Sequence, residues 1–177
     1  MIVLCSGAPK SGTHLNLRCV SLFPGVLAVH GHVPFGDVVS QEGHVEIIRN
    51  PRNVLCSWSR ASGKSLIDSI PTVIPLLQAH VGWIDAGAHV VRFEELLGDA
   101  TGASTLAALG TYLGATPLAD HWRRMWGGTA TFTGALSDWR TQWFAGLNTE
   151  WALAGGPYLE SVYGYDAGSD PMTRTAS

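Results

Sequence analysis

The sequence predicts an α/β fold in which a parallel β-sheet is flanked by helices in three layers. Two observations carry this prediction. Short apolar runs alternate with longer stretches of helical periodicity, and hydrophobic residues make up 46% of the chain while charged residues make up only 14%. A chain of 177 residues is long enough for one core that buries about two-thirds of the unfolded surface. We therefore expect a single domain over residues 1–166 and a flexible tail over 167–177.

The expected elements follow from these runs in chain order. The strands are Ile2–Cys5, Val26–His30, Val45–Ile48 and His89–Arg92. One helix is expected to begin near Gly12, and another at Asn50-Pro51, where a capping residue precedes proline in the first helical position. Two further helices are expected over Ile70–Ala86, broken at Pro75, and over Ala103–Leu113. From Trp122 onward the periodicity weakens.

Charge, cysteine content and the amino-terminal stretch narrow the expected partners. The formal net charge of −3 provides no general basic field, so we expect no nucleic-acid partner. Cys5, Cys19 and Cys56 are odd in number and lack metal-ligand spacing, which favours free thiols and no metal. The opening apolar run is too short for a signal peptide or a membrane span. These features predict a cytoplasmic protein with no membrane partner.

The stretch CSGAPKSGTH, residues 5–14, predicts an anion-binding loop. It follows the first strand and places two glycines, Gly7 and Gly12, around Lys10. A strand that turns through glycines into a helix presents backbone N–H groups at the positive end of the helix dipole. Ser11 and Thr13 add hydroxyl donors, so the expected ligand is a phosphate. The order of lysine and glycine differs from a Walker A loop, and a plain strand-to-helix connection is the alternative.

A second candidate lies in VEIIRNPRNVLCSWSR, residues 45–60. Its apolar strand is followed by Arg49, and the carboxyl ends of strands are where open α/β sheets bind ligands. A guanidinium at that edge, together with the Ser57 hydroxyl from the following helix, suits a second phosphate bound bidentately. The alternative is an arginine that only ends a strand at the surface.

Together these stretches resemble the cytosolic-type sulfotransferases, a P-loop-like family that uses 3′-phosphoadenosine 5′-phosphosulfate (PAPS) as donor. The family's Pro-Lys-Ser-Gly-Thr loop around the 5′-phosphosulfate is matched by Pro9, Lys10, Ser11, Gly12 and Thr13, followed by His14. Its pair on the 3′-phosphate is matched by Arg49 and Ser57. The resemblance implies that all of these residues bind the donor and that Lys10 is also catalytic. It extends in patches from Ser6 to Asp166.

Three later stretches carry further implied roles. His30-Gly31-His32-Val33-Pro34 is similar to the family's Lys-Thr-His-Leu-Pro segment, which would make His32 the catalytic base, with His30 as its rival. The strand end at Phe93 is similar to one that lies near the adenine. The stretch GALSDW, which begins at Gly134, resembles a loop that closes over the 3′-phosphate.

Several departures from the family pattern affect these roles. Phe132 and Thr133 stand where the family has basic residues before the tail glycine, so the 3′-phosphate would depend on Arg49, Ser57, and Arg52 or the Gly134 backbone. The adenine-stacking tryptophan after the phosphate loop is replaced, and Trp58 or Trp139 is the expected substitute. The chain is also short, so the acceptor site is expected to be open or completed by a second subunit of a homo-oligomer.

The resemblance implies in-line transfer of a sulfuryl group to a hydroxyl or amine of a small organic acceptor. The product would be adenosine 3′,5′-bisphosphate (PAP), and no metal is required. A P-loop kinase that uses Mg-ATP is one alternative, but the strand Val45–Ile48 leads into Arg49 rather than an aspartate that could hold magnesium. A non-catalytic nucleotide-binding module is another.

Overall fold

The computed structural model describes residues 1–36, 42–98, 100–125 and 138–165. Its sheet has four strands, all parallel, in the order β2-β1-β3-β4. The strands confirm the four apolar runs of the sequence, with bounds of Ile2–Ser6 for β1, Leu27–His30 for β2, Gly43–Ile48 for β3 and His89–Arg92 for β4. Because all strands run the same way, their carboxyl ends and the loops that follow them lie at one edge of the sheet.

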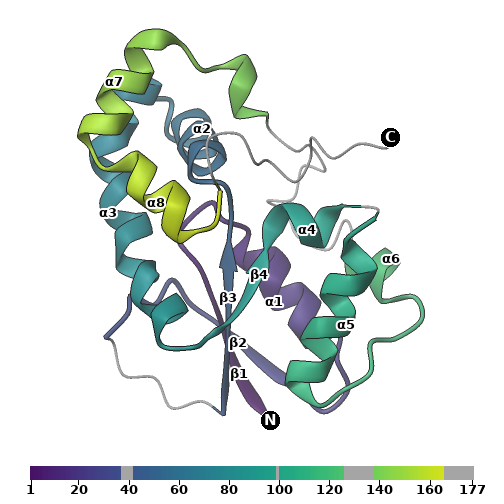
Figure 1. Ribbon diagram of the computed structural model, residues 1–177. Coiled ribbons are helices and arrows are strands. Elements are labelled where there is room, and N and C mark those ends of the chain that lie inside the picture. The colour runs from purple at the N-terminus through teal and green to yellow at the C-terminus, as the bar shows by residue number, and fades with distance from the viewer. Residues whose placement is uncertain (37–41, 99, 126–137, 166–177) are drawn as a thin grey trace.

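Helices flank this sheet, an arrangement compatible with the predicted three layers (Figure 1). On one side, helices α1, α5 and α6 pack on the apolar strand residues Val3, Val45 and Ile47. On the other side, α2, α3, α7 and α8 build a second core around Leu77 and Trp151. The helices are α1 (Thr13–Ser21), α2 (Pro51–Ser62), α3 (Leu66–Asp85), α4 (Phe93–Leu97), α5 (Gly102–Leu113), α6 (His121–Met125), α7 (Ala145–Leu153) and α8 (Gly156–Val162), with a 3-10 turn, η1, over Trp139–Thr141.

Helix α2 begins where the sequence predicts, and its cap fixes the loop that follows β3. The Asn50 side chain accepts hydrogen bonds from the backbone N–H groups of Arg52, at 3.0 Å, and Asn53, at 3.4 Å. Pro51 occupies the first helical position, where its missing N–H costs nothing. This local geometry places Arg49 between the end of β3 and the cap residue of α2, at the carboxyl edge of the sheet.

The predicted break at Pro75 is wrong, because α3 runs without interruption from Leu66 to Asp85. Pro71 and Pro75 are four residues apart and both lie on the exposed side of the helix. Each removes one backbone N–H from the helical ladder. The opposite side packs Val73 and Leu77 fully into the core, and we infer that this burial offsets the lost hydrogen bonds.

Helix α5 confirms the helix predicted over Ala103–Leu113, but the other helices after β4 were less visible in the sequence. The short α4 begins at Phe93, where only a strand end was expected, α6 spans the point at which periodicity weakens, and α7 and α8 follow it. Trp151 and Tyr163 anchor α7 and the end of α8 in the core at 1% exposure each. None of the described helices is both long and apolar enough to cross a membrane. The predicted tail over 167–177 lies outside the described residues.

Candidate functional site

The loop between β1 and α1 is a tight turn closed by its own hydrogen bonds. The backbone N–H of Ser11 donates to the Ala8 carbonyl at 3.0 Å, and the Ser11 hydroxyl donates to the same oxygen at 2.6 Å. The Thr13 hydroxyl donates to the Gly7 carbonyl at 3.4 Å. Both predicted phosphate donors therefore point at loop carbonyls in this structure, and each has to rotate before it can meet a ligand. Lys10 is exposed and adopts a φ of 71°, a left-handed conformation that is uncommon outside glycine.

Close packing explains both glycines of this loop. A Cβ atom at Gly7 would lie 2.6 Å from the Ile47 carbonyl oxygen on the neighbouring strand. A Cβ at Gly12 would lie 2.5 Å from the Phe93 ring, and Gly12 also has a φ of 105° as the N-cap of α1. The loop thus rests directly on β3 and on the start of α4.

Arg49 joins the loop to the carboxyl end of β3. Its Nη1 donates to the Lys10 carbonyl at 3.2 Å, and its guanidinium carbon lies 4.5 Å from the centre of the Phe93 ring. The side chain is only 6% exposed, and burial lowers its pKa from the usual arginine value, against the opposing charge of Glu94. The structure therefore brings together Lys10, Gly12, Arg49 and Phe93, four of the residues predicted from the sequence.

Glu94, which the sequence analysis did not assign to the site, supports this arrangement from behind. Its carboxylate accepts hydrogen bonds from the Asn50 backbone N–H at 3.1 Å and from the Tyr165 hydroxyl at 2.6 Å. Burial raises its pKa, and the Tyr165 hydrogen bond and the charge of Arg49 oppose that shift without reversing it. Glu94 thereby ties the cap of α2 to the end of the described chain.

His32 lies against the other side of the loop. Its Nδ1 is 2.8 Å from the Gly7 carbonyl oxygen and 3.5 Å from the Thr13 hydroxyl. A carbonyl can only accept, so Nδ1 carries the hydrogen and the Nε2 of the neutral ring bears the lone pair. The ring is exposed. His32 is consequently in the tautomer that a general base requires.

The segment after His32 is held by α3. The Trp83 indole N–H donates to the Val33 carbonyl at 2.8 Å, and the Phe35 backbone N–H donates to the Ala79 carbonyl at 2.8 Å. The Phe35 ring fills the space that a side chain at position 82 would need, so Gly82 is required there. These contacts restrict the position of the backbone that carries His32.

The remaining predicted residues lie on the loop, on α1 and on α2, or outside the described residues. Pro9 is half-buried in the loop and His14 is exposed on the first turn of α1. Ser57 is half-buried on the second turn of α2. Gly134, Phe132 and Thr133 lie outside the described residues. The described chain resumes at Asp138, and the backbone N–H of Trp139 donates to the Asn53 side chain at 3.1 Å, which places the end of the GALSDW stretch beside the first turn of α2.

Arg52 and Trp139 are engaged with each other. The Arg52 guanidinium lies 4.3 Å from the Trp139 ring and 4.7 Å from the Trp143 ring, and it forms a salt bridge with Glu160. Trp151 also donates to the Glu160 carboxylate, at 2.8 Å. This arrangement fastens η1 and α7 to α2. In this structure it occupies two side chains that the sequence analysis offered as ligand contacts.

A buried polar cluster, formed by Ser6, His44, Glu46 and His80, was missed in the sequence. It lies between the sheet and α3. His80 Nδ1 is 2.8 Å and His44 Nε2 is 3.1 Å from the Glu46 carboxylate, to which the Ser6 hydroxyl also donates. Burial raises the pKa of Glu46, but the hydrogen bonds from His44, His80 and Ser6 outweigh it, so the pKa is lowered. The only sequence signal was the alternation of polar and apolar residues over Gly43–Ile48.

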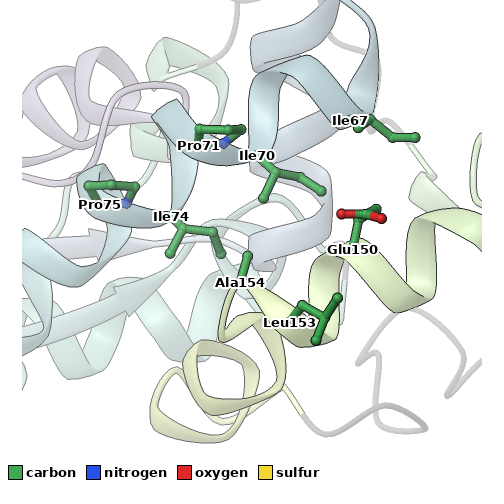
Figure 2. Close-up of a pocket in the computed structure, with 8 residues that line it drawn as sticks. All are labelled: Ile67, Ile70, Pro71, Ile74, Pro75, Glu150, Leu153 and Ala154. Atoms are coloured by element: carbon green, nitrogen blue, oxygen red, sulfur yellow. The ribbon is translucent and has the colours of Figure 1, made fainter.

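An apolar cavity of about 440 Å³ lies elsewhere, between the amino-terminal half of α3 and α7 (Figure 2). Ile67, Ile70, Ile74 and Leu153 line it, together with the Glu150 carboxylate. Its lining holds no basic side chain and no residue of the phosphate loop. A phosphorylated ligand therefore has no counter-charge there, and the candidate site is the loop edge rather than this cavity.

Comparison with known proteins finds no family model and no curated protein that matches the chain. Within the residues that the structure describes, no group of three or more histidine, cysteine or acidic side chains is arranged to hold a metal ion.

Proposed function

We propose that this protein is a PAPS-dependent sulfotransferase with a three-layer, P-loop-like fold. The observation that supports this most is the contact between Arg49 and the Lys10 backbone at the carboxyl edge of the sheet. A donor with phosphates at two positions needs two cationic sites a short distance apart. The glycine-bounded turn with Lys10 supplies one and Arg49 the other. The Phe93 ring, which lies between them in contact with both Gly12 and Arg49, supplies an apolar surface for the adenosine.

The proposed reaction is a direct in-line transfer. The acceptor hydroxyl oxygen forms a bond to the donor sulfur while the bond from sulfur to the bridging oxygen of the 5′-phosphate breaks. The hydroxyl proton goes to Nε2 of His32, and the bridging oxygen leaves with adenosine 3′,5′-bisphosphate. Lys10 and the backbone N–H groups at the start of α1 stabilise the charge that develops on the leaving oxygen. The acceptor is a small organic hydroxyl or amine compound.

The setting proposed is the cytoplasm. Cys5, Cys19 and Cys56 are buried and free, as expected for thiols that are neither disulfide-bonded nor reactive. Burial raises the pKa of the Cys5 thiol to about 12 and that of Cys56 to about 11.

The test is a thermal-shift comparison of adenosine 3′,5′-bisphosphate with ATP plus magnesium. At 100 times its dissociation constant, a ligand adds about 2.7 kcal/mol of stability, which corresponds to about 5–10 °C for a chain of this size. We expect this shift with the bisphosphate. Stabilisation by Mg-ATP alone would contradict the sulfotransferase proposal and favour a P-loop kinase. The bisphosphate could also stabilise the protein while no bisphosphate is released from PAPS with any hydroxyl acceptor of a panel. This result would indicate a non-catalytic nucleotide-binding module.

Lys10→Ala provides the matching activity test. Loss of one electrostatic donor to the leaving group slows turnover by roughly 10²- to 10³-fold. Lys64→Ala is the matched control because Lys64 is the other lysine of the chain and is exposed on the turn between α2 and α3. Release of bisphosphate from PAPS should fall with Lys10→Ala and stay unchanged with Lys64→Ala. Equal rates for the two variants would exclude the catalytic role of Lys10.

A further inference from the structure

Three histidine rings lie together beside the phosphate loop. The rings of His14 and His30 are stacked, with centroids 4.8 Å apart and planes 26° apart. The His32 ring meets His30 edge-on, with centroids 5.4 Å apart. His14 comes from the first turn of α1, and His30 is the last residue of β2. All three side chains are exposed, so a ligand in solution can reach them.

The backbone holds this group in place. The Gly31 N–H donates to the Cys5 carbonyl at 3.3 Å, which continues the pairing of β2 with β1 beyond His30. A Cβ at position 31 would lie 2.7 Å from the Val33 side chain, so Gly31 joins the two histidines without displacing Val33. Residues two apart in an extended chain point to the same side, which explains why His30 and His32 meet.

The charge around these rings favours an anion. Partial burial is the largest cause that lowers the pKa of His30. The charges of His14 and His32 lower this pKa further. His14 also stands at the amino-terminal end of α1, where the helix dipole is positive. A carboxylate bound against the stacked pair has the opposite effect on the pKa of His30. Its negative charge stabilises the protonated imidazole, which the neighbouring imidazoles destabilise.

The proposed donor leaves this group unused. Its two phosphates are assigned to the loop with Lys10 and to Arg49, and Arg49 contacts the loop at the Lys10 carbonyl. The histidines lie on the β2 side of the same loop, where His32 contacts Gly7 and Thr13. The base and the stacked pair consequently share the side from which an acceptor must approach.

We propose that His14 and His30 bind an acidic group of the acceptor, so that the preferred substrate is a hydroxy acid rather than a neutral alcohol. The inference rests on the proposed function for the identity of the acceptor, and it moves His14 from the donor side to the acceptor side. His32 keeps its own role, with Nε2 available for the hydroxyl proton. A phenol that carries a carboxylate has the right chemistry.

The experiment measures binding directly, without requiring turnover. Protein saturated with adenosine 3′,5′-bisphosphate, in the presence of a metal chelator, is titrated with 4-hydroxybenzoate and with its uncharged methyl ester. The imidazole signals are followed by NMR at pH 6 and pH 8. We expect the acid to bind about tenfold more tightly than the ester at pH 6, with most of this preference lost at pH 8, and to raise the apparent pKa of His30.

Two variants and one control locate the effect. His30→Gln and His14→Gln replace exposed side chains and should each remove the preference for the acid at pH 6. His89→Gln is the control, because its ring stacks on Tyr112 at the start of β4 instead of lying at the loop. Equal binding of acid and ester, or a preference that survives His30→Gln in folded protein, would overturn the inference.

The two proposals can fail separately. If the bisphosphate does not stabilise the protein, the sulfotransferase assignment fails, and the histidine titration is repeated on the unliganded chain. An acid-specific shift of His30 would then retain the anion site without the transferase. If the bisphosphate binds and the acid shows no preference, the donor assignment remains and the acidic acceptor is excluded.

Discussion

Glu46 and Glu94 are both almost fully buried, at 0% and 3% exposure, yet their surroundings drive their ionisation in opposite directions. Glu46 lies in the middle of β3 and is met by three side chains, two of them imidazoles that can carry a proton. Its pKa is lowered. Glu94 lies just after β4 and is met mainly by neutral donors, and its pKa is raised.

The difference shows what a buried carboxylate needs in order to stay charged. Removal from water favours the neutral form in both cases. At Glu46, several short hydrogen bonds from side chains on the sheet and α3 outweigh that cost. At Glu94, one hydroxyl, one backbone N–H, one side-chain amide and the nearby charge of Arg49 do not. The first cluster is therefore a structural element of the sheet, whereas Glu94 supports the cap of α2 beside Arg49 with a carboxyl group whose pKa is raised.

The largest expected effect is at Glu46. Glu46→Leu removes the shared partner of His44 and His80, and the loss of one member of a buried charged network costs about 3–5 kcal/mol of unfolding free energy. Urea unfolding at pH 7 measures it. Glu46→Gln keeps one oxygen acceptor and should lose less. A loss below about 1 kcal/mol for Glu46→Leu would show that the cluster is not the structural element inferred here.

The next effect tests the packing beside Glu94. Gly12→Ala places a methyl group against the Phe93 ring at a positive φ, and overpacking with backbone strain costs about 1–3 kcal/mol. The same variant should also weaken bisphosphate binding. Gly63→Ala is the control, since Gly63 has a φ of 69° but no atom within 4 Å of the added Cβ. If both variants lost the same free energy of unfolding, the effect at Gly12 would come from its positive φ and not from the contact with Phe93.

The two glutamates should change the stability of the protein with pH in opposite directions. Because the pKa of Glu46 is lowered, its contribution is present above pH 4.5 and is lost as the pH falls through the folded value. Because the pKa of Glu94 is raised, its contribution is present below pH 4.5 and is lost as the pH rises through the folded value. Each contributes at most about 1.4 kcal/mol per pH unit.

Urea unfolding of the Glu46→Gln and Glu94→Gln variants between pH 3.5 and pH 9 measures this difference. The free energy of unfolding of Glu94→Gln should increase relative to that of the unmodified protein as the pH rises. For Glu46→Gln, the loss of unfolding free energy should be smallest at acidic pH. Parallel curves for the two variants would mean that the pKa values of both carboxyl groups shift in the same direction on folding.

The smallest expected effect concerns the link from the Glu46 cluster to His32. The Trp83 ring lies 4.1 Å from the His44 ring, and its N–H holds the Val33 carbonyl. Trp83→Phe keeps the ring contact and removes the hydrogen bond, at a cost of about 1 kcal/mol. Thermal unfolding checks it. No change in stability would indicate that the Phe35 contacts alone hold this segment.

Local sequence signals were sufficient for the sheet and for the cap of α2. Four apolar runs became four strands, and Asn50-Pro51 began a helix, because capping and β-pairing depend on residues within a few positions of one another. The break expected at Pro75 does not occur. A proline inside an isolated helix costs stability, but the apolar side of α3 packs against α2, α7 and α8 over the same turns.

The candidate site was predictable only in part. Lys10, Gly12, Arg49 and Phe93 were expected at one edge and lie in contact there. The Glu46 cluster was not expected, because His44 and His80 are 36 positions apart and only the placement of α3 over β3 brings them to one carboxylate. The stack of His14 on His30 likewise depends on α1 crossing back beside β2.

The amino-acid sequence by itself determined a parallel α/β sheet, a glycine-bounded turn with one lysine, and an arginine after the third strand. These features arise from neighbours along the chain. The tertiary structure decided in which direction the pKa of each buried acid shifts, which helix tolerates its prolines, and which three histidines meet beside the turn. Each of these outcomes depends on desolvation and contact between segments distant in sequence, and such contacts exist only after the strands have been ordered and the helices packed on them.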